Sequence, residues 1–290
     1  MRVAAFPRWR AGLGSFMNDL VTALRSGRVL LMDGAMGTEL QHRTRAARFD
    51  GLEQLNLTQP DLVQCVHRDY LDAGAKVLLT NTFQADPHAA EIWQSALRLA
   101  RAVGPRFVLA DVGPIAKLTD EDAAAIWRRC EGADGLLMET WSSVAALERF
   151  ARVTTEMPLL ASFTFQRDTG EWLTFENVRP EECAAAAQRC GAVALGANCG
   201  KDLDMAAMLE IVRRYRAACD LPIFVRPNAG TPIQVGAEWR FPRTPEDLAA
   251  GVPALVAAGI GMIGGCCGTT PEHVRAFRRA LWQTAVLRER

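Results

Sequence analysis

Short apolar runs alternate with longer amphipathic segments along most of the chain. Each run is rich in Val, Leu or Ile, as expected for parallel strands that are buried on both faces. Eight such runs cover residues 28–33, 75–81, 106–113, 134–140, 158–165, 192–199, 222–228 and 259–266. Helical segments lie between them, among them residues 60–74, 87–103, 181–191, 202–219 and 244–259. Eight strand-plus-helix units predict an α/β fold, a single (β/α)8 TIM barrel, with a doubly wound sheet as the alternative.

The same pattern sets the expected domain boundaries. No linker rich in Ser, Gly or Pro divides the chain, and no repeat recurs at a fixed period, so residues 17–290 are expected to form one barrel. Residues 1–16 lack a continuous apolar stretch, and we interpret them as a disordered N-terminal extension rather than a targeting segment.

Composition narrows the class of protein. Hydrophobic residues make up 49% of the 290 residues and charged residues 23%, which is typical of a soluble globular protein. The 33 Lys and Arg balance the 33 Asp and Glu, so net charge gives no reason to expect nucleic acid as a partner. No apolar run is long enough to span a bilayer. Eight cysteines without a secretory signal predict reduced thiols and a cytoplasmic location.

The C-terminal ends of the strands form the active site of such a barrel. Polar residues, glycines and three of the eight cysteines fall there, at positions 33–34, 81–83, 111–114, 139–140, 198–200, 226–230 and 266–268. The other five cysteines lie in predicted helical segments, where buried thiols act as small hydrophobes: Cys65, Cys130, Cys183, Cys190 and Cys219. We therefore expect the catalytic and binding residues at the C-terminal ends of the strands.

Cys266 and Cys267 stand side by side between glycines on a predicted strand-to-helix turn. Strands six and eight are near neighbours in a barrel, so Cys199 could approach the pair across the rim. Three thiolates make a soft site that suits zinc, and three protein ligands leave a fourth position open, as in catalytic zinc sites. The alternative is that Cys199 only packs at the rim and the pair is incidental.

An ordered set of motifs resembles the homocysteine S-methyltransferase family, most of all the homocysteine-binding domain of cobalamin-dependent methionine synthase. The motifs are DGAMGTEL (33–40), LNLTQPDLVQCVHRDYLDAGAKVLLTNTF (55–83), DVGP (111–114), METWSS (138–143), GANC (196–199), RPNAG (226–230) and GGCCGTTPEHV (264–274). The resemblance runs from about residue 28 to about residue 280. It implies an enzyme that transfers a methyl group to the thiol of homocysteine, forming methionine, with Zn2+ held by Cys199, Cys266 and Cys267.

The resemblance also implies roles for substrate-binding residues. Asp33 and Glu139 would meet the ammonium group of homocysteine. The backbone around Gly34 and Ala35 and the side chain of Thr82 would hold its carboxylate, and Asn228 would occupy the fourth zinc position when substrate is absent. From the residues alone, other roles stay open: Asp33 could cap the following turn, Glu139 could pair with an arginine, and Asn228 is a typical turn residue.

The methyl donor is less well defined than the acceptor. A zinc-bound thiolate is only a nucleophile, so the donor must arrive activated, as S-methylmethionine, S-adenosylmethionine or methylcobalamin on a separate protein, with betaine ranked below them. We expect no folate- or cobalamin-binding module within this sequence. Two alternatives are therefore a homocysteine-activating subunit of a split methionine synthase and a methyltransferase for another small thiol or selenol.

Two positions depart from the family pattern. The segment after DVGP, residues 115–130, is short, so the rim beside the donor is expected to be more open or shaped for a different partner. Arg226 precedes PNAG, where the related domain carries an acidic or apolar residue.

Overall fold

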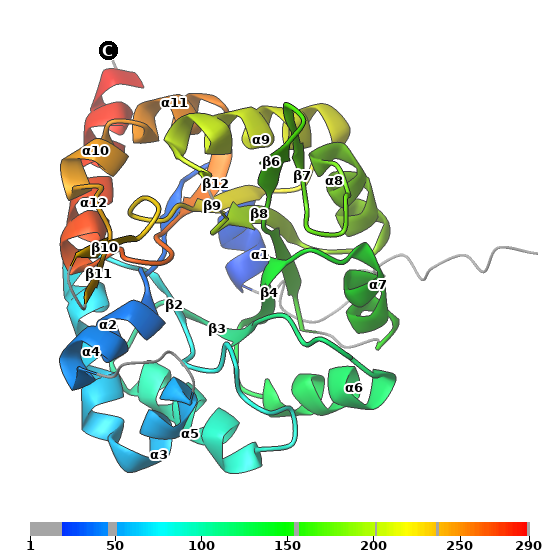
Figure 1. Ribbon diagram of the computed structural model, residues 1–290, viewed down its shortest axis with the longest axis vertical. Helices are drawn as coiled ribbons and strands as arrows, with labels where there is room; N and C mark the ends of the chain where they lie inside the picture. Colours follow the sequence, from blue (N-terminus) through cyan, green and yellow to red (C-terminus); the bar gives the residue numbers. More distant parts are fainter. Residues whose placement is uncertain (1–18, 46–50, 154–156, 201, 236–237, 289–290) are drawn as a thin grey trace, which may run out of the picture.

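A computed structural model gives the fold of residues 19–45, 51–153, 157–200, 202–235 and 238–288. Eight parallel strands form the sheet, in the spatial order β1, β12, β9, β8, β5, β4, β3, β2 (Figure 1). They are β1 (Leu30–Leu31), β2 (Val77–Leu79), β3 (Phe107–Val112), β4 (Gly135–Trp141), β5 (Leu159–Phe163), β8 (Ala194–Asn198), β9 (Ile223–Arg226) and β12 (Ile260–Ile263). Seven of them lie within predicted runs, and β4 extends one residue beyond its run, to Trp141, so the eight predicted strands are confirmed.

The two edge strands meet and close the sheet into a barrel. Met32 and Val77 form an isolated parallel bridge, and the N–H of Asp33 donates to the carbonyl of Val77 over 3.0 Å. This closure excludes the doubly wound alternative. The predicted extension at residues 1–16 lies outside the described residues.

Helices surround the barrel, as Figure 1 shows. They are α2 (Met36–Thr44), α3 (Leu55–Thr58), α4 (Pro60–Ala73), α5 (Ala90–Ala102), α6 (Asp120–Arg129), α7 (Val144–Arg152), α8 (Pro180–Arg189), α9 (Met205–Ala218), α10 (Pro245–Ala249), α11 (Val252–Ala257) and α12 (Pro271–Arg288), with a 3-10 turn at Leu52–Gln54. The remaining helix, α1 (Asp19–Leu24), lies at the centre of this ring in the figure. The helical segment expected at 244–259 is divided in two. Pro253 has no N–H to continue the helix from α10, and it is tolerated in the first turn of α11.

Two hydrophobic clusters lie on either side of the strands. The inner one fills the barrel, with Leu79, Leu137 and Phe224 among its members, and Leu20 and Leu24 of α1 belong to it. The outer one packs the strands against the surrounding helices. Alternate strand residues therefore face the barrel interior, and this orients the polar residues at the strand ends.

Two antiparallel hairpins, which the apolar pattern does not predict, follow strands of the barrel. β6 (Gln166–Asp168) and β7 (Glu171–Leu173) follow β5, and β10 (Ile233–Val235) and β11 (Glu238–Arg240) follow β9. Both are insertions at the C-terminal ends of strands, where the candidate chemistry lies. Within the described residues, no helix has the length and apolar character needed to cross a membrane.

Gly196 in β8 provides a test of this packing. A Cβ added there would lie 2.2 Å from a ring carbon of Phe224, which is fully buried in the inner cluster. We predict that Gly196→Ala lowers the free energy of unfolding by about 1–3 kcal/mol, as overpacking of a core does. Chemical denaturation measures the loss.

The matched control is Gly261→Ala in β12, where the nearest atom to a new Cβ is 3.7 Å away. Its effect should be clearly smaller than that of Gly196→Ala. Equal effects of the two substitutions would contradict the described packing of the barrel interior.

Candidate metal and substrate site

Three cysteines converge at the C-terminal ends of the strands. Cys199 directly follows β8, and Cys266 and Cys267 lie just beyond β12; β9 runs between these two strands. Their Sγ atoms all lie within 4.8 Å of one another, and those of Cys199 and Cys267 are 3.9 Å apart. None of the three forms a disulfide. The expected approach of Cys199 to the pair is therefore present in the fold.

The backbone around the cysteines holds them in place. Cys199 adopts a left-handed conformation with a φ of 54°, which turns its side chain away from the strand direction. The loop after β9 bonds to the cysteine pair on both sides: the N–H of Cys266 donates to the carbonyl of Pro227, and the N–H of Ala229 donates to that of Cys267, each over 2.9 Å. The pair is thus fixed to the strand that lies between the two cysteine-bearing strands.

The remaining cysteines lie elsewhere. Cys130, Cys183 and Cys219 are buried, as expected for small hydrophobic side chains, and Cys190 is partly buried. Cys65 in α4 is exposed, so it is not a core residue. Among the described Cys, His, Asp and Glu side chains, the trio of Cys199, Cys266 and Cys267 is the group that could hold a metal ion.

Two asparagine amides contact the sulfur atoms. Nδ2 of Asn228 donates to Sγ of Cys199, and Nδ2 of Asn198 donates to Sγ of Cys266, each over 3.6 Å. Asn198 also accepts from the backbone N–H of Thr140 and so ties β8 to β4. Amide donors favour the thiolate form of cysteine. Asn198 was not singled out in the sequence, although it occupies a strand end.

The three thiols also act on one another. The thiols of Cys266 and Cys267 hydrogen-bond to Cys199 and lower the pKa of Cys199, while the same contacts raise the pKa values of Cys266 and Cys267. These contacts thus favour the thiolate form of Cys199. A bound cation would stabilise the thiolate form of all three.

A buried cluster of charged residues lies at the same end of the barrel. Nη1 of Arg226 in β9 donates to Oδ1 of Asp33 over 2.8 Å. Nε of Arg226 lies 2.8 Å from Oε1 of Glu139 in β4, close enough for an ion pair but not aligned for a hydrogen bond. All three side chains are more than 90% buried. Glu139 thus pairs with an arginine, the alternative that its residue type left open.

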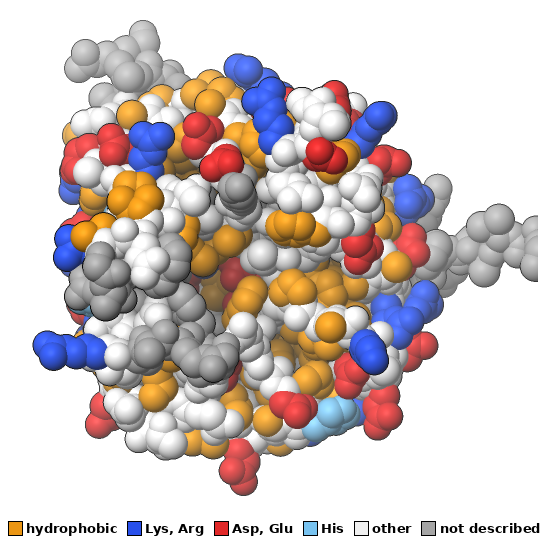
Figure 2. Space-filling view, viewed as in Figure 1, with side chains coloured by type: hydrophobic (Ala, Val, Ile, Leu, Met, Phe, Trp, Pro, Cys, Tyr) orange, Lys and Arg blue, Asp and Glu red, His pale blue; other side chains and the backbone are white. Residues whose placement is uncertain are grey.

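Asp111 at the end of β3 is a third buried carboxyl in this region. Burial and the nearby charge of Glu139 raise the pKa of Asp111 well above its usual range. Burial likewise raises the pKa of Glu139 to about 7, against the lowering effect of Arg226. Figure 2 shows acidic side chains inside a hollow at the centre of the ring of helices.

Gly34, Ala35 and Thr82, the residues predicted to bind the substrate carboxylate, contact other residues of the protein in this structure. The hydroxyl of Thr82 donates to the carbonyl of Asp111 over 2.7 Å. The N–H of Ala35 donates to Oγ1 of Thr269 over 3.2 Å, and Gly34 packs so closely against Tyr70 that a Cβ would lie 2.7 Å from its ring. The roles of Gly34, Ala35 and Thr82 toward a substrate stay predictions.

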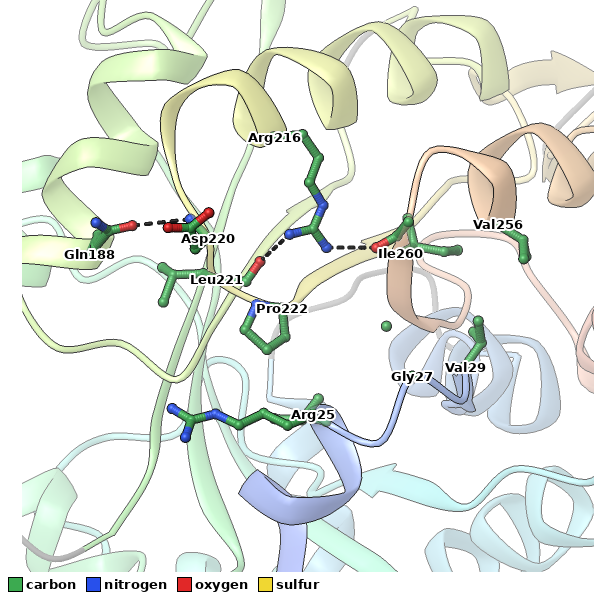
Figure 3. A pocket seen from close by; sticks show the side chains of 13 residues that line it. Arg25, Gly27, Val29, Gln188, Arg216, Asp220, Leu221, Pro222, Val256 and Ile260 are labelled. Carbon is green, nitrogen blue, oxygen red and sulfur yellow. Dashed lines mark hydrogen bonds between the residues drawn. The ribbon is translucent and has the colours of Figure 1, made fainter. Parts of the chain in front are cut away.

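A hollow at the opposite end of the barrel has a different character. It has a volume of about 640 Å³ and lies beside Val29, Pro222 and Gly259, which precede β1, β9 and β12 (Figure 3). Arg216 crosses it and donates to the carbonyls of Leu221 and Gly259. Its guanidinium thus links two loops at the N-terminal ends of the strands. In TIM barrels this face contributes to stability, whereas the active site lies at the opposite face.

Comparisons with known proteins point in one direction. Methionine synthases of Mycobacterium tuberculosis and Mycobacterium leprae are each 31% identical to the chain, over 91% and 97% of it. The chain spans about a quarter of their length, 25% and 26%. The apo form of the homocysteine methyltransferase MmuM from Escherichia coli is similar in structure, with a TM-score of 0.69 and 27% identity over 89% of this chain and 99% of that one.

The same Escherichia coli protein has also been solved in a metallated form, which covers the same shares of the two chains with a TM-score of 0.71 and 24% identity. The profile of the homocysteine S-methyltransferase family matches residues 30–281, which include all eight strands of the barrel. The chain therefore belongs to the homocysteine S-methyltransferase family and has a TIM-barrel fold.

Proposed function

We propose that the protein is a zinc-dependent methyltransferase that forms methionine from homocysteine. The observation that carries this proposal is the convergence of three thiols beside a buried acidic cluster at the active end of the barrel. The three thiols form a site for a metal ion, to which the attacking sulfur of homocysteine would bind. The acidic cluster supplies negative charge for the ammonium group of an amino-acid substrate.

The thiols suit zinc in their number and in the one spacing that corresponds directly to a pair of ligands. Tetrahedral zinc with bonds of about 2.3 Å keeps its sulfur ligands about 3.8 Å apart, close to the 3.9 Å between Cys199 and Cys267. Oδ1 of Asn228, whose amide contacts Cys199, is buried and has no hydrogen-bond partner among the described residues. An unpartnered oxygen beside three thiols suits the predicted role of Asn228 at the fourth position. The metallated form of the Escherichia coli protein is consistent with a metal here.

The proposed roles follow from this arrangement. Cys199, Cys266 and Cys267 would hold the zinc, which when bound stabilises the thiolate form of a substrate sulfur at neutral pH. Glu139 lies in the same buried region and supplies negative charge for the substrate ammonium. Gly34, Ala35 and Thr82 line the strand ends where its carboxylate would lie, and they would exchange their present contacts for it.

The reaction requires an activated methyl donor. The sulfur of homocysteine loses its proton and attacks the methyl carbon; a sulfur–carbon bond forms while the bond from the methyl group to the donor breaks, and the donor departs with the electron pair. S-methylmethionine, S-adenosylmethionine and methylcobalamin on a separate protein each provide such a leaving group. Betaine ranks below them.

A split methionine synthase is the second candidate. The similarity of the chain to the mycobacterial methionine synthases, at 31% identity, supports it. In that case the chain would activate homocysteine, and a separate corrinoid protein would deliver the methyl group. The third candidate, a methyltransferase for another small thiol or selenol, differs from both in its acceptor and can be tested by competition.

We predict one zinc per chain. Replacing Cys199, Cys266 or Cys267 with Ser should abolish activity and weaken zinc binding by more than the roughly 10- to 100-fold that loss of an outer contact costs. Metal content after dialysis against a chelator measures the effect. Cys65→Ser, at an exposed thiol outside the site, is the control and should retain zinc. Full zinc occupancy in Cys267→Ser would show that the ligand assignment is wrong.

The donor is identified by turnover. We predict that the zinc-loaded protein forms methionine from homocysteine with a sulfonium donor or, more slowly, with free methylcobalamin. Mass spectrometry follows the product for S-methylmethionine, S-adenosylmethionine, methylcobalamin and betaine in parallel. Rapid turnover with S-methylmethionine and none with methylcobalamin would eliminate the split synthase. No methionine from any of the four donors would contradict the proposed reaction.

A further inference from the structure

The acidic cluster has more carboxyl groups than cations. Asp33, Asp111 and Glu139 are all buried at one end of the barrel, and Arg226 is the only Lys or Arg among the described residues that is buried. A buried carboxylate without a compensating charge or hydrogen bond is costly. Three carboxyl groups around one guanidinium therefore leave room for a further cation.

Both carboxylate oxygens of Asp33 accept hydrogen bonds from the protein. Its Oδ1 accepts from Nη1 of Arg226 over 2.8 Å, and its Oδ2 accepts from the backbone N–H of Leu79 over 2.7 Å. Only 1% of the residue is exposed. Each carboxylate oxygen thus has a donor, which makes Asp33 an anchor between β1, β2 and β9 rather than a free counter-charge.

Arg226 contacts three groups of the protein, two of them through hydrogen bonds. Besides its contact with Asp33, Nη2 donates to the carbonyl of Gly34 over 3.3 Å, and Nε faces Oε1 of Glu139 at 2.8 Å. All three nitrogens of the guanidinium are therefore directed at Asp33, Gly34 and Glu139. This leaves Asp111 as the carboxyl that Arg226 does not contact.

Asp111 is buried and incompletely satisfied. Its Oδ1 has no hydrogen-bond partner among the described residues. Its backbone, by contrast, is fully bonded: the N–H donates to the hydroxyl of Thr80, and the carbonyl accepts from that of Thr82. The side chain is held in place while one of its oxygens lacks a donor.

The strand register places Asp111 near Glu139. Asp111 in β3 pairs with Leu137 in β4, and Glu139 is two residues further along that strand. Leu109 and Leu137, two residues before Asp111 and Glu139, both belong to the cluster inside the barrel. Because side chains alternate along a strand, Asp111 and Glu139 face the same interior.

We propose that Asp111, together with Glu139, binds the ammonium group of the amino-acid substrate, and that Arg226 holds Asp33 in a structural role. This inference rests on the proposed function and specifies how the substrate is recognised. An ammonium group supplies a positive charge that stabilises the ionised form of Asp111, and a hydrogen-bond donor for its unpartnered oxygen. It makes Asp111 a determinant of preference for amino-acid thiols over thiols without an amino group.

The test compares two thiols that differ only in this group. Binding of L-homocysteine and of 4-mercaptobutanoate, its analogue without the amino group, is measured by calorimetry on zinc-loaded protein. Asp111→Asn should weaken homocysteine binding by about 10-fold or more, the usual effect of a lost charged hydrogen bond. Binding of 4-mercaptobutanoate should stay within about 3-fold of the wild type, because it has no ammonium group to lose.

Controls separate this role from a structural one. Glu53→Gln changes another buried carboxyl, one that accepts from the backbone of Gln84, and should leave the ratio of the two affinities unchanged. Asp111→Ser is the second variant if Asp111→Asn does not fold, as judged by zinc content and circular dichroism.

The possible results lead to different conclusions. Equal weakening of both thiols, or no change in either, would overturn the role of Asp111 while leaving the proposed function intact. Failure of the wild-type protein to bind homocysteine would overturn the proposed function and this inference with it.

Discussion

One buried guanidinium connects the parts of the candidate site. Arg226 belongs to β9, between the two strands that carry the cysteines, and reaches Asp33 after β1 and Glu139 in β4. The residues that follow it bond to the backbone of Cys266 and Cys267. Removing this one cation would leave buried carboxylates without compensation, a change that typically costs several kcal/mol. The same short segment thus balances the charge of the acidic cluster and positions two of the three thiols.

The barrel explains why these groups can meet at all. Parallel strands deliver all their C-terminal ends to one face, so residues separated by more than 60 positions, such as Cys199 and Cys266, become neighbours. The inner hydrophobic cluster, which includes residues of α1, fills the barrel beneath these strand ends. The chemistry proposed for the family then needs only two features at this face: sulfur ligands for a metal and counter-charge for an amino acid.

The sequence predicts the scaffold better than the side-chain pairing. Apolar runs identify all eight strands because parallel strands are buried on both faces, and strand ends identify the cysteine trio. The division of the helix near Pro253, the two hairpins and the exposure of Cys65 were not expected. The ion pairs of Arg226 join residues up to 193 positions apart, and no local pattern encodes such contacts. For the same reason the sequence marks Asp111 only as a strand-end residue, whereas its unpartnered oxygen is a feature of the folded structure.

X-ray absorption at the zinc edge tests the central claim most directly, because it counts the sulfur atoms around the metal. For the zinc-loaded protein we predict three sulfur ligands at about 2.3 Å and one lighter ligand, consistent with Cys199, Cys266, Cys267 and an oxygen such as that of Asn228. Addition of homocysteine should raise the count to four sulfurs and remove the lighter ligand. A count that stays at three when homocysteine is bound would contradict activation of its thiol by the metal.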